Sequence, residues 1–143
     1  MHIQEQIVKK VSILIKKKNY KEAKSILLNF IKTAKNTKID IKIFYGLYLS
    51  SDALKEEKDA KKYLEKCNKI NDKNHIILNN LANLYLKEGN LSKAEKFYLK
   101  SLELEDNYLL GIINIAIFYQ NVGRFTESKK FYLKAIELSP ERI

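Results

Sequence analysis

The side chains that could do chemistry in this sequence are few and scattered. Its 143 residues contain one cysteine, Cys67, and two histidines, His2 and His75. One thiol and two imidazoles cannot supply the four ligands of a structural zinc site, and a lone cysteine cannot form an intrachain disulfide. The four glycines are dispersed, so no phosphate-binding loop is formed. We therefore expect no catalytic residue, no metal site, no cofactor and no enzymatic activity.

The composition favours long helices joined by short turns. Only 4 glycines and 1 proline accompany 45% hydrophobic and 31% charged residues, too few turn residues for a many-stranded sheet. The length suits a single domain over residues 1–143. The longest apolar stretch, 109–119, is interrupted by Asn114 and is short of the roughly 20 residues that span a bilayer. With no signal-peptide pattern at the start, we expect a cytoplasmic protein without membrane insertion.

An internal repeat organises the second half of the chain. At a shift of 34 residues, Phe97-Tyr98-Leu99-Lys100 falls on Phe131-Tyr132-Leu133-Lys134. Gly89 falls on Gly123 in the same alignment. A fixed period in this range indicates stacked supersecondary units.

The repeat resembles the tetratricopeptide repeat, which has this period and a pattern of Leu-Gly, Tyr, Ala, an aromatic residue and Pro. The matching residues are Leu78, Leu81-Ala82, Tyr85, Ala94 and Tyr98 in one unit, and Ile112, Ile115-Ala116, Tyr119, Ser128, Tyr132 and Pro140 in the next. The resemblance implies an all-α fold, a right-handed superhelical array of antiparallel helix pairs. The expected units are 4–37, 41–74, 75–108 and 109–142.

The first two units depart from the pattern. Tyr48 stands where a small residue is expected, Ser51 replaces the tyrosine between helices, and Lys55-Glu56 replaces the Gly-Asn turn. Lys10 occupies an apolar position of the first unit, and three extra residues fall in 36–40. Both units nevertheless keep the central alanine and are expected to form helix pairs.

Two local patterns predict how the helices begin, end and pack. Gly89 is expected to stop one helix, and Ser92 with Glu95 has the spacing of a capping box for the next. Cys67 aligns with Ser101 and Ala135, which predicts a packed thiol in a small-residue position and not a nucleophile.

The resemblance also implies where a partner binds, because the first helix of each pair lines a concave groove in this family. We expect a protein or peptide partner, held as an extended or helical segment, and a scaffold or adaptor role. Side-chain amides suit a peptide backbone because they both donate and accept, and Asn80 and Asn114, one repeat apart, would form a short ladder. The predicted groove residues are Tyr45, Leu49, Asn79, Asn80, Asn83, Ile113, Asn114, Ile117 and Gln120.

One specialised family function can be tested on the residues. Members that clamp the terminal carboxylate of chaperones use Lys, Asn and Arg at fixed groove positions, which here are Tyr45, Leu49, Asn80, Leu110 and Asn114. Only Asn80 fits that pattern. The sequence therefore predicts no recognition of chaperone carboxyl-terminal tails.

The strongly basic first half offers an alternative function. Residues 1–74 hold 18 Lys against 9 acids, and the chain carries a net charge of +10, which suits nucleic acid or an acidic partner. Lysine dominates over arginine and aromatic residues do not interleave with the cluster, so a protein partner is favoured over nucleic acid. The lysines concerned are Lys9, Lys10, Lys16, Lys17, Lys18, Lys21 and Lys24.

A second alternative is self-association at the carboxyl-terminal helix. Solenoids need polar caps, since an end repeat otherwise exposes its stacking face. Tyr132, Ile136 and Leu138 are expected at such an open edge, and an exposed apolar patch of this kind marks an interface. A homo-oligomer is the expected consequence of this alternative.

Overall fold

The computed structural model describes residues 2–142, which form eight α-helices and one short 3-10 helix, with no strand in that range. The chain divides into two compact units, each of which contains two helix pairs: the first unit is Met1–Asp72 and the second unit is Lys73–Ile143. The first unit contains α1 (His2–Lys16), α2 (Tyr20–Thr33), α3 (Ile41–Ala53) and α4 (Glu57–Ile70). The second contains α5 (His75–Lys87), α6 (Leu91–Leu104), α7 (Leu109–Asn121), α8 (Phe125–Leu138) and η1 (Pro140–Arg142).

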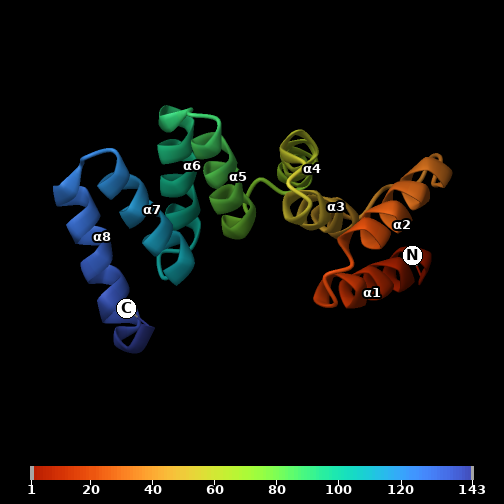
Figure 1. Ribbon diagram of the computed structural model, residues 1–143, viewed down its shortest axis with the longest axis horizontal. Helices are drawn as coiled ribbons and strands as arrows, with labels where there is room; N and C mark the ends of the chain where they lie inside the picture. The colour runs from red at the N-terminus through yellow and green to blue at the C-terminus, as the bar shows by residue number, and fades with distance from the viewer. Residues whose placement is uncertain (1, 143) are drawn as a thin grey trace. The chain divides into compact units, whose positions relative to one another are not determined.

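Consecutive helices pack as pairs. In the first unit α1 contacts α2 and α3 contacts α4; in the second, α5 contacts α6 and α7 contacts α8. Figure 1 shows each pair as neighbouring ribbons joined by a tight turn. The turns cover residues 17–19, 54–56, 88–90 and 122–124, too short for anything but an antiparallel return. The predicted all-α fold of antiparallel helix pairs, the class called the α-α superhelix, is confirmed.

One backbone conformation ends the first helix of every pair. Lys18, Lys55, Gly89 and Gly123 have φ angles of 60°, 60°, 79° and 80°. The amide after each donates to a carbonyl five residues earlier: Asn19 to Leu14, Glu56 to Ser51, Asn90 to Tyr85 and Arg124 to Tyr119, at 2.8–2.9 Å. The first two turns therefore keep the geometry after losing the glycine, and their lysines carry the strain of the left-handed region.

The start of α6 differs from the prediction. Asn90 is the N-cap, and its Oδ1 accepts from the backbone amide of Lys93 at 3.2 Å. Ser92 already lies inside the first turn, so the capping box of Ser92 and Glu95 is wrong. The physical reason is that an asparagine two residues earlier reaches the same unpaired amides.

The small residues of the pattern lie in the core, where they allow helices to approach closely. Ala82, Ala94, Ser101, Ala116, Ser128 and Ala135 are all buried. Ser101 Oγ donates to the carbonyl of His75 at 2.7 Å, and Cys67 Sγ makes the equivalent, longer contact of 3.8 Å with the carbonyl of Ile41. The predicted small-residue position of Cys67 thus joins the second helix of a pair to the start of the first.

The loop with three extra residues is held against α1. Gln4 Nε2 donates to the carbonyl of Lys38 at 3.0 Å, and Gln4 Oε1 accepts from the amide of Asp40 at 2.8 Å. Asp40 then caps α3 by accepting from the amide of Lys42 at 2.8 Å. One glutamine side chain therefore fixes where α3 begins relative to α1, and these two helices form the site described next.

Candidate partner-binding groove

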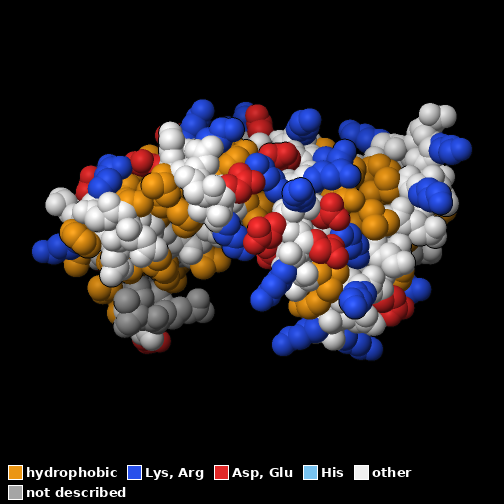
Figure 2. All heavy atoms as spheres, turned by 45° about the horizontal axis from the view of Figure 1, so that its top comes forward, with side chains coloured by type: hydrophobic (Ala, Val, Ile, Leu, Met, Phe, Trp, Pro, Cys, Tyr) orange, Lys and Arg blue, Asp and Glu red, His pale blue; other side chains and the backbone are white. Residues whose placement is uncertain are grey.

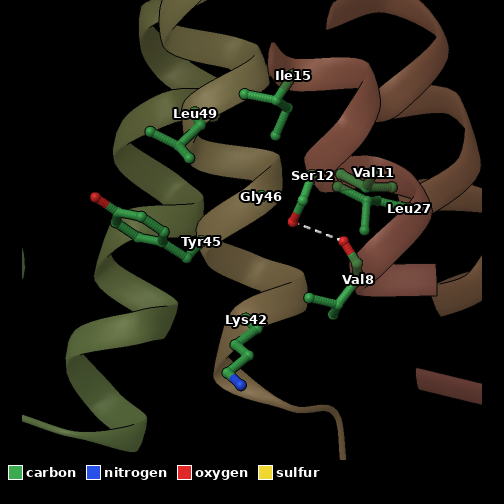
Figure 3. Close-up of a pocket in the computed structure, with 9 residues that line it drawn as sticks. All are labelled: Val8, Val11, Ser12, Ile15, Leu27, Lys42, Tyr45, Gly46 and Leu49. Carbon is green, nitrogen blue, oxygen red and sulfur yellow. Dashed lines mark hydrogen bonds between the residues drawn. The ribbon is translucent and has the colours of Figure 1, made fainter. Parts of the chain in front are cut away.

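A pocket of about 340 Å³ opens between α1 and α3 in the first unit. Its wall on α1 consists of Val8, Ser12 and Ile15, and its wall on α3 includes Tyr45 and Leu49 (Figure 3). The remaining lining residues are Val11, Leu27, Lys42 and Gly46. The volume lies within the range of about 300–1,000 Å³ that is common for ligand sites.

Gly46 is part of the lining of this pocket. A Cβ at this position would meet Leu27 Cδ1 at 3.0 Å and Val11 Cγ1 at 3.6 Å, so the missing side chain lets α3 pack closely against both residues. The equivalent positions one and two repeats later hold Asn80 and Asn114. The repeat position that carries amides in the later repeats thus has no side chain at this pocket.

The chemistry of the pocket is apolar with a cationic rim. Val8, Ile15 and Leu49 are half-buried and present carbon to the opening. Ser12 Oγ donates to the carbonyl of Val8 at 2.8 Å (Figure 3), so this hydroxyl is already used within the helix. Lys42 is exposed at the rim. An apolar side chain with a neighbouring carboxylate is the chemistry that such a pocket fits.

Sequence reasoning placed Tyr45 and Leu49 at this site and missed the wall on α1. The three residues of that wall lie in the expected repeat 4–37, which departs from the repeat pattern at Lys10. Two signals could have found them: Gly46 at the position of the amide ladder, and the i, i+4, i+7 spacing of Val8, Ser12 and Ile15 on one helix face.

The groove amides predicted in the second unit are engaged with one another and with tyrosines. Asn79 is only 1% exposed, and its Oδ1 accepts from Asn114 Nδ2 at 3.3 Å. The described hydrogen bond of Asn114 thus runs to Asn79, in place of the predicted ladder with Asn80. Burial removes Asn79 from contact with a partner, because it sits on the side of α5 that meets α7.

Two further groove residues hold the second helix of their pair. Asn83 Oδ1 accepts from the hydroxyl of Tyr98, and Gln120 Oε1 accepts from the hydroxyl of Tyr132 at 2.9 Å. These positions therefore have a structural role in addition to any contact with a partner. Asn80 and Ile113 are half-buried, and Ile117 is exposed.

Lysines are spread over the first unit, but one of the predicted cluster is not available. Figure 2 shows Lys and Arg side chains in blue crowded over this unit, on the right. Lys24 Nζ bonds Asp59 Oδ2 at 2.7 Å and also the carboxylate of Glu56, and its side chain is only 13% exposed. Burial alone would lower the pKa of Lys24, but the two hydrogen bonds outweigh it and raise this pKa. The other six lysines of the cluster are exposed.

The second unit has an ion pair at the equivalent place, with the acidic and basic residues exchanged between the two helices. Glu95 Oε1 accepts from Arg124 Nη1 at 2.8 Å and from the hydroxyl of Tyr119 at 2.9 Å. The guanidinium of Arg124 also lies 4.6 Å from the centre of the Tyr119 ring. In both units, an ion pair thus joins the second helix of one pair to the start of the second helix of the next.

The reactive side chains are placed for packing. Cys67 is fully buried, and burial raises the pKa of its thiol to about 12, so it stays protonated near neutral pH. His75 packs edge-on against Tyr108, with ring centres 4.7 Å apart.

Within residues 2–142, no three His, Cys, Asp or Glu side chains gather as a metal site. No helix in that range has the length and apolar character to cross a membrane.

The predicted carboxyl-terminal edge is exposed to different degrees. Ile136 is 42% exposed and Tyr132 is half-buried. Leu138 is 40% exposed, but its equivalents in the preceding units, Leu104 and Ile70, are 42% and 46% exposed. The exposure of Leu138 is therefore a property of this repeat position and not of the edge.

The structure resembles solved helical-repeat proteins. MamA superposes with a TM-score of 0.84 over 97% of this chain and 80% of its own, at 19% identity. YrrB, described as a TPR protein with an unusual peptide-binding site, gives 0.79 over 92% of this chain and 66% of its own, at 20% identity. A tetratricopeptide repeat protein from Parabacteroides merdae gives 0.85 over all of this chain and 56% of its own, at 16% identity.

The helix pairs and these likenesses define the class: an all-α helical-repeat protein. Residues 75–108 and 112–142 each match a family model described as tetratricopeptide repeat, while no curated protein matches the chain. Residues 75–108 and 112–142 are thus two tetratricopeptide repeats. Repeats of this family are protein–protein interaction modules, so the general class of function is protein binding.

Proposed function

We propose that the chain binds a segment of a partner protein in the groove between α1 and α3, with one apolar side chain of the partner inserted over Gly46. The observation that carries this proposal is the pocket itself, whose walls on α1 and α3 are mainly apolar and whose lining includes Gly46. Burial of apolar surface contributes roughly 25 cal/mol per Å². A Leu-sized anchor would therefore supply a substantial part of the binding free energy.

The charge around the pocket favours an acidic segment. Lys42 is exposed at the rim, and residues 1–72 hold 17 Lys against 9 acidic residues. Charges at the edge of an interface mainly raise the association rate and select the partner. We therefore propose a partner segment with Asp or Glu beside its apolar anchor, as part of a non-catalytic adaptor role in the cytoplasm.

The second unit offers further contacts. Asn80, Ile113, Asn114 and Ile117 keep exposed or half-buried side chains, and they remain the proposed contact residues of that unit. Replacement of Tyr45, Asn80 and Asn114 together by Ala is expected to weaken partner binding. Affinity unchanged in this triple variant would contradict the predicted groove.

The test uses a peptide selected for binding. A random peptide library displayed on phage is selected on the full chain, and the best peptide is measured by fluorescence polarisation. Leu49→Glu places a charge in the pocket wall and should weaken binding at least tenfold, equivalent to about 1.4 kcal/mol. The matched control is Ile13→Glu, since Ile13 is on α1 but outside the pocket and 54% exposed; its affinity should stay within about twofold.

Two results would contradict the proposal. The first is a selection that yields no binder; the second is a peptide that binds Leu49→Glu and wild type equally well. Circular dichroism of each variant confirms that the helices are retained, so that loss of binding reports on the pocket alone.

Nucleic-acid binding by the lysine cluster is the competing outcome. The six exposed lysines are available for phosphate, whereas Lys24 is held by Glu56 and Asp59. Affinity for a single-stranded RNA would fall steeply between two salt concentrations, because each phosphate contact releases a counterion. Peptide binding anchored by an apolar side chain should change much less.

A further inference from the structure

The outer face of α8 carries an apolar stripe with no counterpart of equal exposure in the preceding repeat. Phe125, Leu133 and Ile136 are 68%, 51% and 42% exposed. With spacings of eight and three residues, they lie on one side of the helix. Their equivalents Leu91, Leu99 and Leu102 are 47%, 38% and 8% exposed. Orange side chains gather over α7 and α8 at the left of Figure 2.

In the preceding repeat a neighbouring helix covers the position of Ile136, while the positions of Phe125 and Leu133 stay exposed. The equivalent of Ile136 is Leu102, which is buried where α6 meets α7. A Cβ on Gly111 would lie 3.4 Å from Leu102 Cδ2, so the backbone of a neighbouring helix approaches this position directly. A helix packed on α8 in the same way would cover Ile136.

The charges beside the stripe are arranged so that α8 complements itself. Lys129 and Lys130 lie in its first half, whereas Glu137 lies in its last turn and Glu141 follows in η1. The side chains of all four are exposed. Glu127 and Lys134 also lie on α8, and their helical spacing turns them away from the stripe. Two α8 helices packed antiparallel would place the lysines of each against the glutamates of the other. A parallel arrangement would place like charges together, which is unfavourable.

We propose that α8 is the interface between two copies of this chain, packed antiparallel around a twofold axis near Leu133. Phe125, Leu133 and Ile136 supply the apolar contact, and the Lys129–Lys130 and Glu137–Glu141 pairs set the direction. Twofold dimers, in which the same patch faces itself, are the commonest soluble oligomers. Head-to-tail packing of α8 on the outer face of α1 is disfavoured, because that face carries Lys9, Lys10, Lys16 and Lys17.

The first test is the mass in solution. Sedimentation equilibrium of the chain at about 100 µM, a concentration that detects weak dimers, should approach twice the chain mass of 16.8 kDa. Ile136→Glu and Leu133→Glu should each return the mass to that of one chain. The matched control is Leu99→Glu at the equivalent position of α6, which should leave the dimer intact. A wild-type monomer at this concentration, or a dimer unaffected by both α8 variants, overturns the proposal.

The second test addresses the direction of packing and does not depend on the apolar contacts. Lys129→Glu with Lys130→Glu should abolish the dimer, and so should Glu137→Lys with Glu141→Lys. The chain with all four changes should dimerise again, because antiparallel packing restores every opposite pair. Failure of the fourfold variant to dimerise, with its helices retained by circular dichroism, overturns the antiparallel arrangement. Peptide binding at the α1–α3 pocket is a separate measurement and survives either result.

Discussion

Replacement of Lys55 by glycine is expected to stabilise the protein, although it removes a side chain. Lys55 has a φ of 60°, in the same turn position that Gly89 and Gly123 occupy at 79° and 80°. A side chain in the left-handed region costs roughly 1–2 kcal/mol. Glycine removes this cost, but its greater freedom in the unfolded chain offsets roughly 0.5–1 kcal/mol of the gain. The net gain for Lys55→Gly is therefore roughly 0.5–1 kcal/mol, or a rise of about 1–4 °C in Tm.

The assay is thermal unfolding followed by circular dichroism at 222 nm, with two controls. Lys55→Ala removes the charge but keeps the Cβ, so it should not reproduce the gain. Gly89→Lys is the reverse change and should lower Tm by a similar amount; a Cβ there would meet no described atom within 4 Å, so its effect comes from the backbone alone. A lower Tm for Lys55→Gly, or an equal gain for Lys55→Ala, would refute the reasoning.

The remaining predictions concern the core and the ion pairs. The hydrogen bond from Lys24 lowers the pKa of Asp59 below its ordinary 3.8. The Lys24–Asp59 pair therefore stabilises the fold above pH 3.8, and this contribution is lost as the pH falls through the pKa of Asp59 in the folded protein. Acid unfolding curves of Lys24→Ala should lack this loss. Leu102→Ala should cost about 2–4 kcal/mol in urea unfolding and Ile136→Ala less than about 1, because only the former leaves a cavity; equal costs would contradict the packing. Ser101→Ala should cost about 1 kcal/mol by losing its hydrogen bond to the part-buried carbonyl of His75, and an unchanged urea midpoint would show that this bond contributes nothing.

The repeat pattern predicted the helix pairs because the small residues at fixed spacing are required by the packing itself. Ala82, Ala94, Ser101 and their equivalents are buried as expected, and Cys67 occupies the same position in the first unit. The 34-residue period thus predicts the helix pairs even where Tyr48 or Lys55 departs from the repeat pattern.

The details that the sequence did not reveal depend on competition between neighbouring side chains. Asn90 and Ser92 can both cap a helix, and only the backbone path of the turn decides that Asn90 does so. Asn79 and Asn80 both carry amides, and the helix rotation buries the former. The pocket required knowing that Gly46 faces Val11 and Leu27, a long-range packing relation that periodicity cannot supply.

The central claim is that a partner segment enters the α1–α3 pocket, and an NMR titration of the ¹⁵N-labelled chain with the selected peptide tests it most directly. The account predicts that the largest amide shifts fall on Val8, Ser12, Gly46 and Leu49, and that Leu49→Glu abolishes them. Shifts confined to α8, or spread over exposed lysines such as Lys17 with no change at Gly46, would contradict it.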